Sequence, residues 1–296
     1  MIHAIPFPDI DPVLVSVELF GITLAIRWYA LAYIAGFLCA MFWIRRALSR
    51  PALWPGHLAP MEPKAVEDLL TYTILGTIIG GRLGYVLFYA WPQTIADPAF
   101  ALRIWDGGMS FHGGFLGVIA AGALFAWRHG VSPGSVGDCF ALGIGFGLFF
   151  GRVANFVNGE LWGRPTDVAW GVVFPNAFCP TGPCARHPSQ LYEAVLEGLL
   201  FLLIAWWLAY GRGVLRRPGL LTAIFFVWYG ACRTFVEAFR QADDQFITLE
   251  NPLGHVLRFG DMGLTMGQVL SLPMVLVGAL LLAWVLRRAA LPAPRA

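Results

Sequence analysis

The sequence predicts an all-α integral membrane protein with about seven transmembrane helices and a small extracytoplasmic head that includes a short β-hairpin. Of its 296 residues, 58% are hydrophobic and only 13% are charged, a composition typical of a protein surrounded by lipid. Apolar stretches recur from end to end, which predicts a single transmembrane domain over residues 1–296. The arginines are strung out between these stretches instead of forming a basic patch, so we expect no nucleic-acid partner.

The beginning of the chain predicts an extracytoplasmic element. Residues 12–26 are rich in β-branched side chains around a central Gly21, a pattern that predicts a short hairpin. Residues 1–14 contain prolines and aspartates but no positively charged n-region, so they do not resemble a cleaved signal peptide. We therefore expect the first apolar stretch to act as the targeting signal.

The apolar stretches approach the roughly 20 residues that a helix needs to cross a bilayer. Each is interrupted by a polar residue or a glycine, so its ends are defined only to within several residues. The predicted spans cover residues 23–44, 69–90, 110–127, 136–158, 190–210, 219–239 and 266–286.

Basic residues are divided unequally between the two sets of connecting segments, and cytoplasmic loops carry the excess of arginine and lysine. The larger set is Arg45, Arg46, Arg50, Lys64, Arg128, Arg212, Arg216, Arg217, Arg287, Arg288 and Arg295. The smaller set is Arg103, Arg164, Arg186, Arg240 and Arg258. We therefore expect a periplasmic N-terminus and a cytoplasmic C-terminus. The periplasmic elements would be residues 1–22, 91–109, 159–189 and 240–265.

Four further arginines, Arg27, Arg82, Arg152 and Arg233, fall inside the predicted spans. At mid-bilayer each opposes insertion by roughly 2.5–3.5 kcal/mol unless it is paired or hydrated. In the predicted orientation all four lie in the outer half of the membrane, whereas chance would place some in the inner half. We infer one cationic chamber that opens toward the outer leaflet and is walled by several helices.

Other polar residues fall at the same level of the predicted membrane. Arg152 and Asn155 form an i, i+3 pair on one helix face, and Tyr229 and Glu237 lie about one turn on either side of Arg233. The remaining candidates are Tyr29, His112, Asn158, Glu160, Gly163 and Arg240. Taken singly, several are also typical of interface aromatics or ordinary ion-pair partners. Their co-location favours a site.

The predicted chamber has an excess of positive charge. Its four arginines face only two nearby acids, Glu160 and Glu237. A ligand could supply the missing negative charge, and phosphate is the anion that the forked arginine side chain matches best.

The 164–187 segment contains Cys179 and Cys184. In an oxidising periplasm a disulfide between them is one interpretation, and two free thiols are another. A zinc site lacks a second cysteine pair. Cys39, Cys139 and Cys232 lie in spans and are typical of small apolar packing residues. Since no metal-ligand spacing or nucleotide-binding loop is present, we expect no metal and no cofactor.

Blocks of sequence along the whole chain resemble the motifs of the prolipoprotein diacylglyceryl transferase family. They are RWYAL at 27–31, GGRLGYVLFY at 80–89, WDGGMSFHGG at 105–114, GRVANFVNGELWGR at 151–164, RHPSQLYE at 186–193, YGACRTFVEAFR at 229–240 and MGQ at 266–268. The 151–164 block resembles the family signature, with Ala154 where many members have glycine. Ala242 in place of a commoner proline, and a distinct 165–185 loop, lie outside the inferred chamber.

The resemblance implies a bacterial inner-membrane enzyme whose active site faces the periplasm. Such an enzyme moves the diacylglyceryl group of phosphatidylglycerol onto the lipobox cysteine of a prolipoprotein, forming a thioether and releasing glycerol phosphate. Its partners would be phosphatidylglycerol, the prolipoprotein signal peptide with its lipobox cysteine, and the lipid bilayer.

The resemblance also implies roles for the candidate residues. Arg152 and Arg233 would bind the phosphate, and His112 is the candidate base, since a thiol with a pKa of about 8.5 needs a base or a positive field to react. Tyr29 and Asn155 complete the catalytic candidates. The substrate-binding candidates are Arg152, Arg233, Glu160, Gly163, Glu237, Arg240, Tyr229, Arg82 and Asn158, with Gly163 also letting the chain turn out of the membrane. A thiolate activated by the arginine field alone is the rival mechanism.

The alternative function class is a membrane carrier or channel for an anionic substrate, because buried arginines also line such sites. A carrier should place polar residues on both sides of the midplane, whereas the inner halves of these spans are nearly featureless apart from Asp138. A lipid-binding scaffold is a third class, and His112 within a glycine-rich element argues against it.

Overall fold

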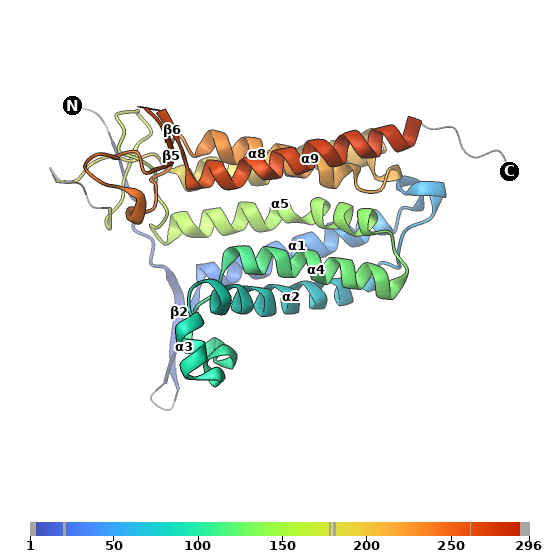
Figure 1. Ribbon diagram of the computed structural model, residues 1–296, viewed down its shortest axis with the longest axis horizontal. Helices are drawn as coiled ribbons and strands as arrows, with labels where there is room; N and C mark the ends of the chain where they lie inside the picture. The colour runs from blue at the N-terminus through green and yellow to red at the C-terminus, as the bar shows by residue number, and fades with distance from the viewer. Residues whose placement is uncertain (1–3, 20–21, 178, 180–181, 261, 291–296) are drawn as a thin grey trace. The chain divides into compact units, whose positions relative to one another are not determined.

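The computed structural model describes residues 4–19, 22–177, 179, 182–260 and 262–290. It is mostly helical with small strand pieces (Figure 1), which confirms the predicted fold class in its main features. Among the described residues, 6 helices are long and apolar enough to cross a membrane. They are α1 (Trp28–Leu48), α2 (Ala65–Phe88), α4 (Phe111–His129), α5 (Pro133–Val157), the helical stretch Ser189–Gly211 and α9 (Met266–Ala290).

The helix at the predicted sixth span is shorter than expected. This helix, α8 (Leu220–Val236), has 17 residues, and at about 1.5 Å per residue it falls short of a hydrocarbon core of about 30 Å. Hydrogen-bonded turns continue beyond it, since Glu237 N donates to Arg233 O at 3.1 Å and Arg240 N donates to Val236 O at 3.2 Å. Whether α8 is a seventh span stays a prediction.

The fifth span is a helix with two π-helical segments. Its parts are α6 (Ser189–Glu193), a π segment at Ala194–Leu199, α7 (Leu200–Trp206) and a second π segment at Trp207–Gly211. A π turn inserts one extra residue and rotates the side chains that follow, and such turns occur frequently at functional sites. Glu193 directly precedes the first π segment and Glu197 lies within it, and both are fully buried.

The first helix begins later than predicted because a strand precedes it. Strands β2 (Val13–Leu19) and β3 (Ile22–Arg27) pair antiparallel, as the sequence predicted, with Val13 opposite Arg27. The turn that contains Gly21 lies outside the described residues. The assignment of Arg27 to a membrane span is therefore wrong, because the β-branched residues before it form β3 and the helix starts at Trp28.

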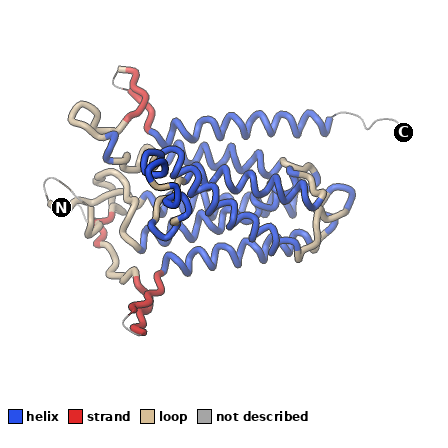
Figure 2. Tube along the Cα trace, turned by 60° about the horizontal axis from the view of Figure 1, so that its bottom comes forward, coloured by secondary structure: helices blue, strands red, loops and turns tan. Residues whose placement is uncertain are grey.

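Two further strand pairs and a short helix lie outside the long helices (Figure 2). Strand β1 (Ile5–Pro6) pairs parallel with β4 (Val172–Val173), and β5 (His255–Phe259) pairs antiparallel with β6 (Met262–Thr265), which leads directly into α9. The short helix α3 (Trp91–Ala96) follows α2.

The chain divides into two compact units, and each is described by itself. The first comprises Met1–Trp43, Ala141–Val214 and Leu220–Ala296, and the second comprises Ile44–Phe140 and Leu215–Gly219.

In the second unit, α2 and α4 pack side by side (Figure 1) through small residues. A Cβ atom on Gly80 would overlap Gly113 O and would lie 2.8 Å from Gly117 Cα. Close approach of this kind is how membrane helices gain packing where lipid gives no hydrophobic driving force. The Ser110 side chain caps α4 by accepting from Gly113 N at 3.2 Å, and Gly130 ends the helix with a left-handed φ of 64°.

In the first unit, α8 and α9 lie side by side (Figure 1) and also meet at glycines. A Cβ atom on Gly230 would lie 3.0 Å from Ser271 O, and one on Gly267 would lie 2.5 Å from the Glu237 carboxylate. The close approach at Gly267 brings the beginning of α9 against the acidic side chain that follows α8.

Candidate functional site

Glu193 is the centre of a buried ion-pair cluster in the first unit. Its carboxylate is fully buried and contacts three guanidinium groups from α5, from α8 and from the turn after α8. The Arg152 Nε atom lies 2.6 Å from Glu193 Oε2, and the NH1 atoms of Arg240 and Arg233 lie 2.8 Å and 3.4 Å from Glu193 Oε1. The fold therefore brings together Arg152, Arg233 and Arg240, which the sequence selected from segments far apart.

Glu237 is the second acid of the cluster. Its Oε2 atom lies 2.5 Å from Arg233 NH1 and 3.4 Å from Arg240 Nε. The Thr265 hydroxyl donates to Glu237 Oε1 at 3.0 Å. Glu237 thus pairs with Arg233, as its position one turn away suggested, and also with Arg240, and β6 adds a hydroxyl to the same carboxylate.

The cluster contains more acidic side chains than the sequence analysis counted. Glu197 is fully buried one turn beyond Glu193 and interacts electrostatically with Arg152, Arg233 and Arg240. With Glu193 and Glu197 included, three described glutamates face these three arginines. The sequence prediction applied the cost of charge in lipid to arginines only, and the same rule would have identified the two acids inside the fifth span.

The paired arginines keep hydrogen-bonding capacity. Each guanidinium has five N–H donors in a planar fork, and the contacts given above engage only part of each fork. Side-chain exposures of 21% for Arg152, 15% for Arg233 and 13% for Arg240 show that none of the three is sealed from its surroundings. The carboxylates hold the forks in place while leaving donors for an anion.

A polar network extends this cluster along the end of α5. Arg152 NH1 donates to Asn155 Oδ1 at 3.5 Å, which confirms the predicted i, i+3 pair. Asn155 Nδ2 and Asn158 Nδ2 donate to Glu160 Oε1 at 2.8 Å and 3.3 Å. Gln190, which the sequence analysis missed, donates to Glu160 O at 2.5 Å.

Tyrosines flank the network. The hydroxyls of Tyr29 and Tyr33 lie 3.0 Å apart on α1, and Tyr33 interacts electrostatically with Arg152 and Glu160. Tyr33 was not predicted, although it lies one turn from Tyr29 on the same helix face. Tyr229 interacts electrostatically with Arg152 and Arg233.

Gly163 lies at a close contact of three chain segments. It forms a bridge with Arg240 and donates from its N–H to His187 O at 2.8 Å. A Cβ atom at this position would overlap Phe239 O. Glycine is therefore required by the close approach of three chain segments next to the cluster, and the φ angle of Gly163 is not among the positive ones.

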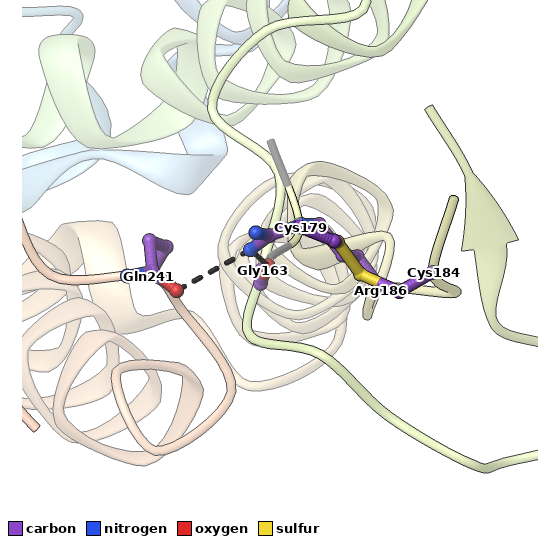
Figure 3. Close-up of a disulfide and its surroundings, with 5 residues drawn as sticks. All are labelled: Gly163, Cys179, Cys184, Arg186 and Gln241. Atoms are coloured by element: carbon purple, nitrogen blue, oxygen red, sulfur yellow. Dashed lines mark hydrogen bonds between the residues drawn. A yellow bond between two sulfur atoms is a disulfide. The ribbon is translucent and has the colours of Figure 1, made fainter. Parts of the chain in front are cut away.

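Arg186 contacts the same junction of chain segments around Gly163 (Figure 3). Its NH1 atom donates to Gly163 O at 3.0 Å and to Gln241 Oε1 at 3.3 Å. Its guanidinium carbon lies 4.1 Å from the centroid of the Trp162 ring, a cation–π contact. Cys179 and Cys184 form a disulfide just before it in the chain, so of the alternatives left open by the sequence the structure has the disulfide.

Burial affects two titratable groups at this junction. It lowers the pKa of His187, whose Nδ1 lies 3.1 Å from the Tyr192 hydroxyl. Burial also lowers the pKa of Arg164, which donates from Nε to Arg240 O at 2.7 Å. Both shifts have the direction that desolvation imposes on a group that is cationic when protonated.

Two predicted residues belong to the second unit. His112 is exposed in the first turn of α4, with its ring centroid 5.7 Å from that of Phe111. Arg82 is only 4% exposed, and its guanidinium donates to the carbonyls of Phe100, Ala101 and Gly107. Arg82 therefore holds the segment between α3 and α4, and these carbonyls satisfy its charge.

Comparison with known proteins gives consistent results over nearly the whole chain. Residues 16–284 match the family described as prolipoprotein diacylglyceryl transferase. A protein of Ruegeria pomeroyi is 52% identical over 292 residues, covering 97% of this chain and 98% of that protein. Proteins of Cereibacter sphaeroides and Rhizobium leguminosarum bv. trifolii are 53% and 48% identical, covering 93% and 98% of this chain and 95% of each relative.

All three relatives are named phosphatidylglycerol–prolipoprotein diacylglyceryl transferase. Identity near one half over almost the full length of both partners is far above what a shared fold alone would give. The chain therefore belongs to the prolipoprotein diacylglyceryl transferase family.

Proposed function

We propose that this chain transfers the diacylglyceryl group of phosphatidylglycerol to the lipobox cysteine of a prolipoprotein. The observation that carries the proposal is a buried cluster of three arginines held by glutamates, in a chain that is about half identical to transferases of that name. A cluster of this kind is suited to a phosphate, because arginine forks bind phosphate oxygens in pairs.

The reaction exchanges one bond to carbon for another. The cysteine sulfur attacks the glycerol carbon that carries the phosphate, so a C–S bond forms and the C–O bond to phosphate breaks. The bonding electrons leave with the phosphate oxygen as glycerol phosphate, and the thiol proton passes to a base. Negative charge develops on the leaving oxygen, and prearranged cations at that position lower the barrier.

Arg152 and Arg233 bind the phosphate in this proposal. Glu193 fixes both guanidinium groups, and Glu237 fixes Arg233 from the other side. Because these carboxylates are already in place, little reorganisation is needed when the lipid arrives. Arg240 contributes to the same positive field.

Other residues position the substrates. Asn155, Asn158 and Glu160 orient the head group at the end of α5, and Tyr29 and Tyr229 support them. Gly163 keeps the segments at 163, 187 and 239 in close contact. Arg82 acts indirectly, by holding the segment that leads to His112.

His112 accepts the thiol proton in the proposed mechanism. Its exposed position at the beginning of α4 leaves the imidazole accessible. The rival is a thiol that loses its proton in the arginine field without a protein base. The variant His112→Gln separates the two, since near-normal transfer by a correctly inserted variant would exclude the base role.

The proposed setting is the bacterial inner membrane. Seven spans cross it, with α8 and its following turns as the sixth, and the N-terminus lies in the periplasm. The strand pairs and the 164–187 segment then form a periplasmic head, and the active site faces that side.

The test uses purified protein, phosphatidylglycerol vesicles and a lipobox peptide. We expect glycerol phosphate release that requires the peptide cysteine, and a loss of about 100-fold or more in rate for Arg152→Gln and Arg233→Gln, by analogy with removal of an oxyanion-stabilising donor. Insertion of the variants, measured by membrane extraction, should be unchanged. Arg103→Gln is the matched control, because Arg103 forms ion pairs with the exposed Asp97 and Asp106. Lipid binding without peptide-dependent release would instead support an anion carrier or a lipid-binding protein.

A further inference from the structure

A pocket of about 120 Å³ opens beside the arginine cluster, within the first unit. It lies where the end of α8, the segment after it and the beginning of α9 meet. Its polar lining includes Glu237, Arg240, Gln241, Asp243 and Thr265, and its apolar lining includes Ala242, Phe246, Met266 and Leu270. None of Gln241, Ala242, Asp243 or Phe246 has a role in the transfer as proposed above.

The pocket is continuous with the charged groups of the cluster. Arg240 lines the pocket and also pairs with Glu193 at 2.8 Å. Glu237 lines it and pairs with Arg233 at 2.5 Å. Glu237 and Arg240 therefore belong both to the cluster and to the pocket lining, so the pocket adjoins the arginines.

The walls of the pocket are held in place by hydrogen bonds. Arg164 donates to Arg240 O at 2.7 Å and to Leu253 O at 3.4 Å. It therefore connects the two ends of the segment 240–253, which contributes several residues to the wall. Asn251 Nδ2 donates to both Phe246 O and His255 O at 2.9 Å. Gly254 adopts a positive φ of 66° and packs against Ala242. A pocket fixed in this way requires little ordering when a ligand binds.

The volume limits the size of the occupant. A cavity of about 150 Å³ holds a benzene molecule of six heavy atoms, so this slightly smaller pocket suits a group of about six heavy atoms. Glycerol also has six heavy atoms, and its hydroxyls both donate and accept hydrogen bonds. They match a lining that offers guanidinium donors, amide groups and the Asp243 carboxylate.

We propose that this pocket binds the terminal glycerol of the phosphatidylglycerol head group and selects that lipid by its two free hydroxyls. The inference rests on the proposed transferase function, and it assigns a specificity role to Ala242, Asp243 and Phe246. A site built to bind hydroxyls discriminates against an analogue without them, because its own polar groups are then left unpaired.

The experiment compares phosphatidylglycerol with phosphatidylethanol, which has the same phosphodiester but no head-group hydroxyl. The full-length protein is assayed in vesicles of each lipid with a lipobox peptide, and kcat/KM is measured for both. We expect the wild type to prefer phosphatidylglycerol by at least tenfold. Ala242→Leu, which fills the pocket, should lower this preference to about twofold or less.

Two further variants keep the outcome interpretable. Ala238→Leu is the matched control, since Ala238 is exposed and does not line the pocket, and it should keep the wild-type preference. Asp243→Asn preserves size and removes the carboxylate from an exposed position, so it should fold normally and raise KM for phosphatidylglycerol severalfold with kcat little changed. A wild type without preference, or an Ala242→Leu protein that keeps it, would overturn the inference.

Failure of the proposed function would look different. In that case neither lipid would act as a diacylglyceryl donor, and the pocket would be tested by the binding of small phosphates alone. Glycerol 1-phosphate should raise the unfolding temperature of the wild type more than ethyl phosphate does, and Ala242→Leu should abolish the difference. Equal effects of the two phosphates on the wild type would reject the pocket as a glycerol site.

Discussion

Glu193 shows how one buried side chain can organise residues from three segments. A carboxylate with no exposed surface is stable in such a position only if it is paired and hydrogen-bonded, and Arg152, Arg233 and Arg240 provide this pairing. The arginines were identified from the sequence because each interrupts an apolar stretch. The same rule, applied to acids, would have identified Glu193 as a buried charge, but its pairing with these arginines depends on which helix faces meet, and one sequence does not contain that information.

The cluster predicts a large effect of neutralising Glu193. In Glu193→Gln three guanidinium groups lose a buried counter-charge, and breaking a buried pair costs about 3–5 kcal/mol. We expect a decrease of that order in the free energy of unfolding, measured by reversible denaturation in mixed micelles. The comparison is Glu67→Gln, which removes an exposed partner of Arg45 and should change stability by at most about 1 kcal/mol. Equal effects of the two substitutions would contradict the central role of Glu193.

Helix packing in this protein depends on positions without side chains. In the α2–α4 pair, glycines let two backbones approach to contact distance, and the same device brings α9 against Glu237. The sequence revealed these glycines but not which of them pack, since Gly147 is also in a helix yet has open space where a Cβ would be. The π segment between Glu193 and Leu200 was likewise invisible to periodicity, because an extra residue per turn leaves the apolar composition unchanged.

Replacing glycine by alanine should have opposite effects at Gly80, where α2 meets α4, and at Gly147 in α5. Gly80→Ala places a methyl group against Gly113 O, and overpacking of this kind costs about 1–3 kcal/mol. Gly147→Ala meets nothing within 4 Å and should be neutral or stabilising, because alanine favours a helix by about 1 kcal/mol over glycine. The thermal midpoints of the two purified variants test this expectation. A Gly80→Ala protein as stable as the wild type would show that α2 and α4 are not in close contact.

The chain is similar to its relatives over nearly its full length. Its membrane orientation is inferred from the distribution of basic residues between the connecting segments. The segments at either end of α2 provide the sharpest test of that orientation. Glu62 precedes the helix and Gln93 follows it, and both are exposed. The basic-residue distribution predicts that the first lies in the cytoplasm and the second in the periplasm.

Labelling of single cysteines tests this orientation. In a background in which Cys39, Cys139 and Cys232 are replaced by alanine, Gln93→Cys should react with a membrane-impermeant maleimide in intact spheroplasts. Glu62→Cys should react only after permeabilisation. Arg217→Cys and Glu250→Cys, which flank α8, should show the same contrast if α8 crosses the membrane. Reversed labelling would invert the orientation, and labelling of both members of the second pair from one side would leave six spans.

Composition and pattern alone determined the membrane class, most helix positions, the β2–β3 strand pair and the set of arginines, because these depend on local hydropathy and on charge within apolar stretches. Only the tertiary structure decided that Arg27 lies in a strand, that the Arg82 guanidinium donates to carbonyls and that Glu193 and Glu197 lie within the arginine cluster. It also placed Gly163 at the contact point of three segments. These features depend on which surfaces meet in space, and a buried charge or a missing Cβ acquires its role only from the group placed against it.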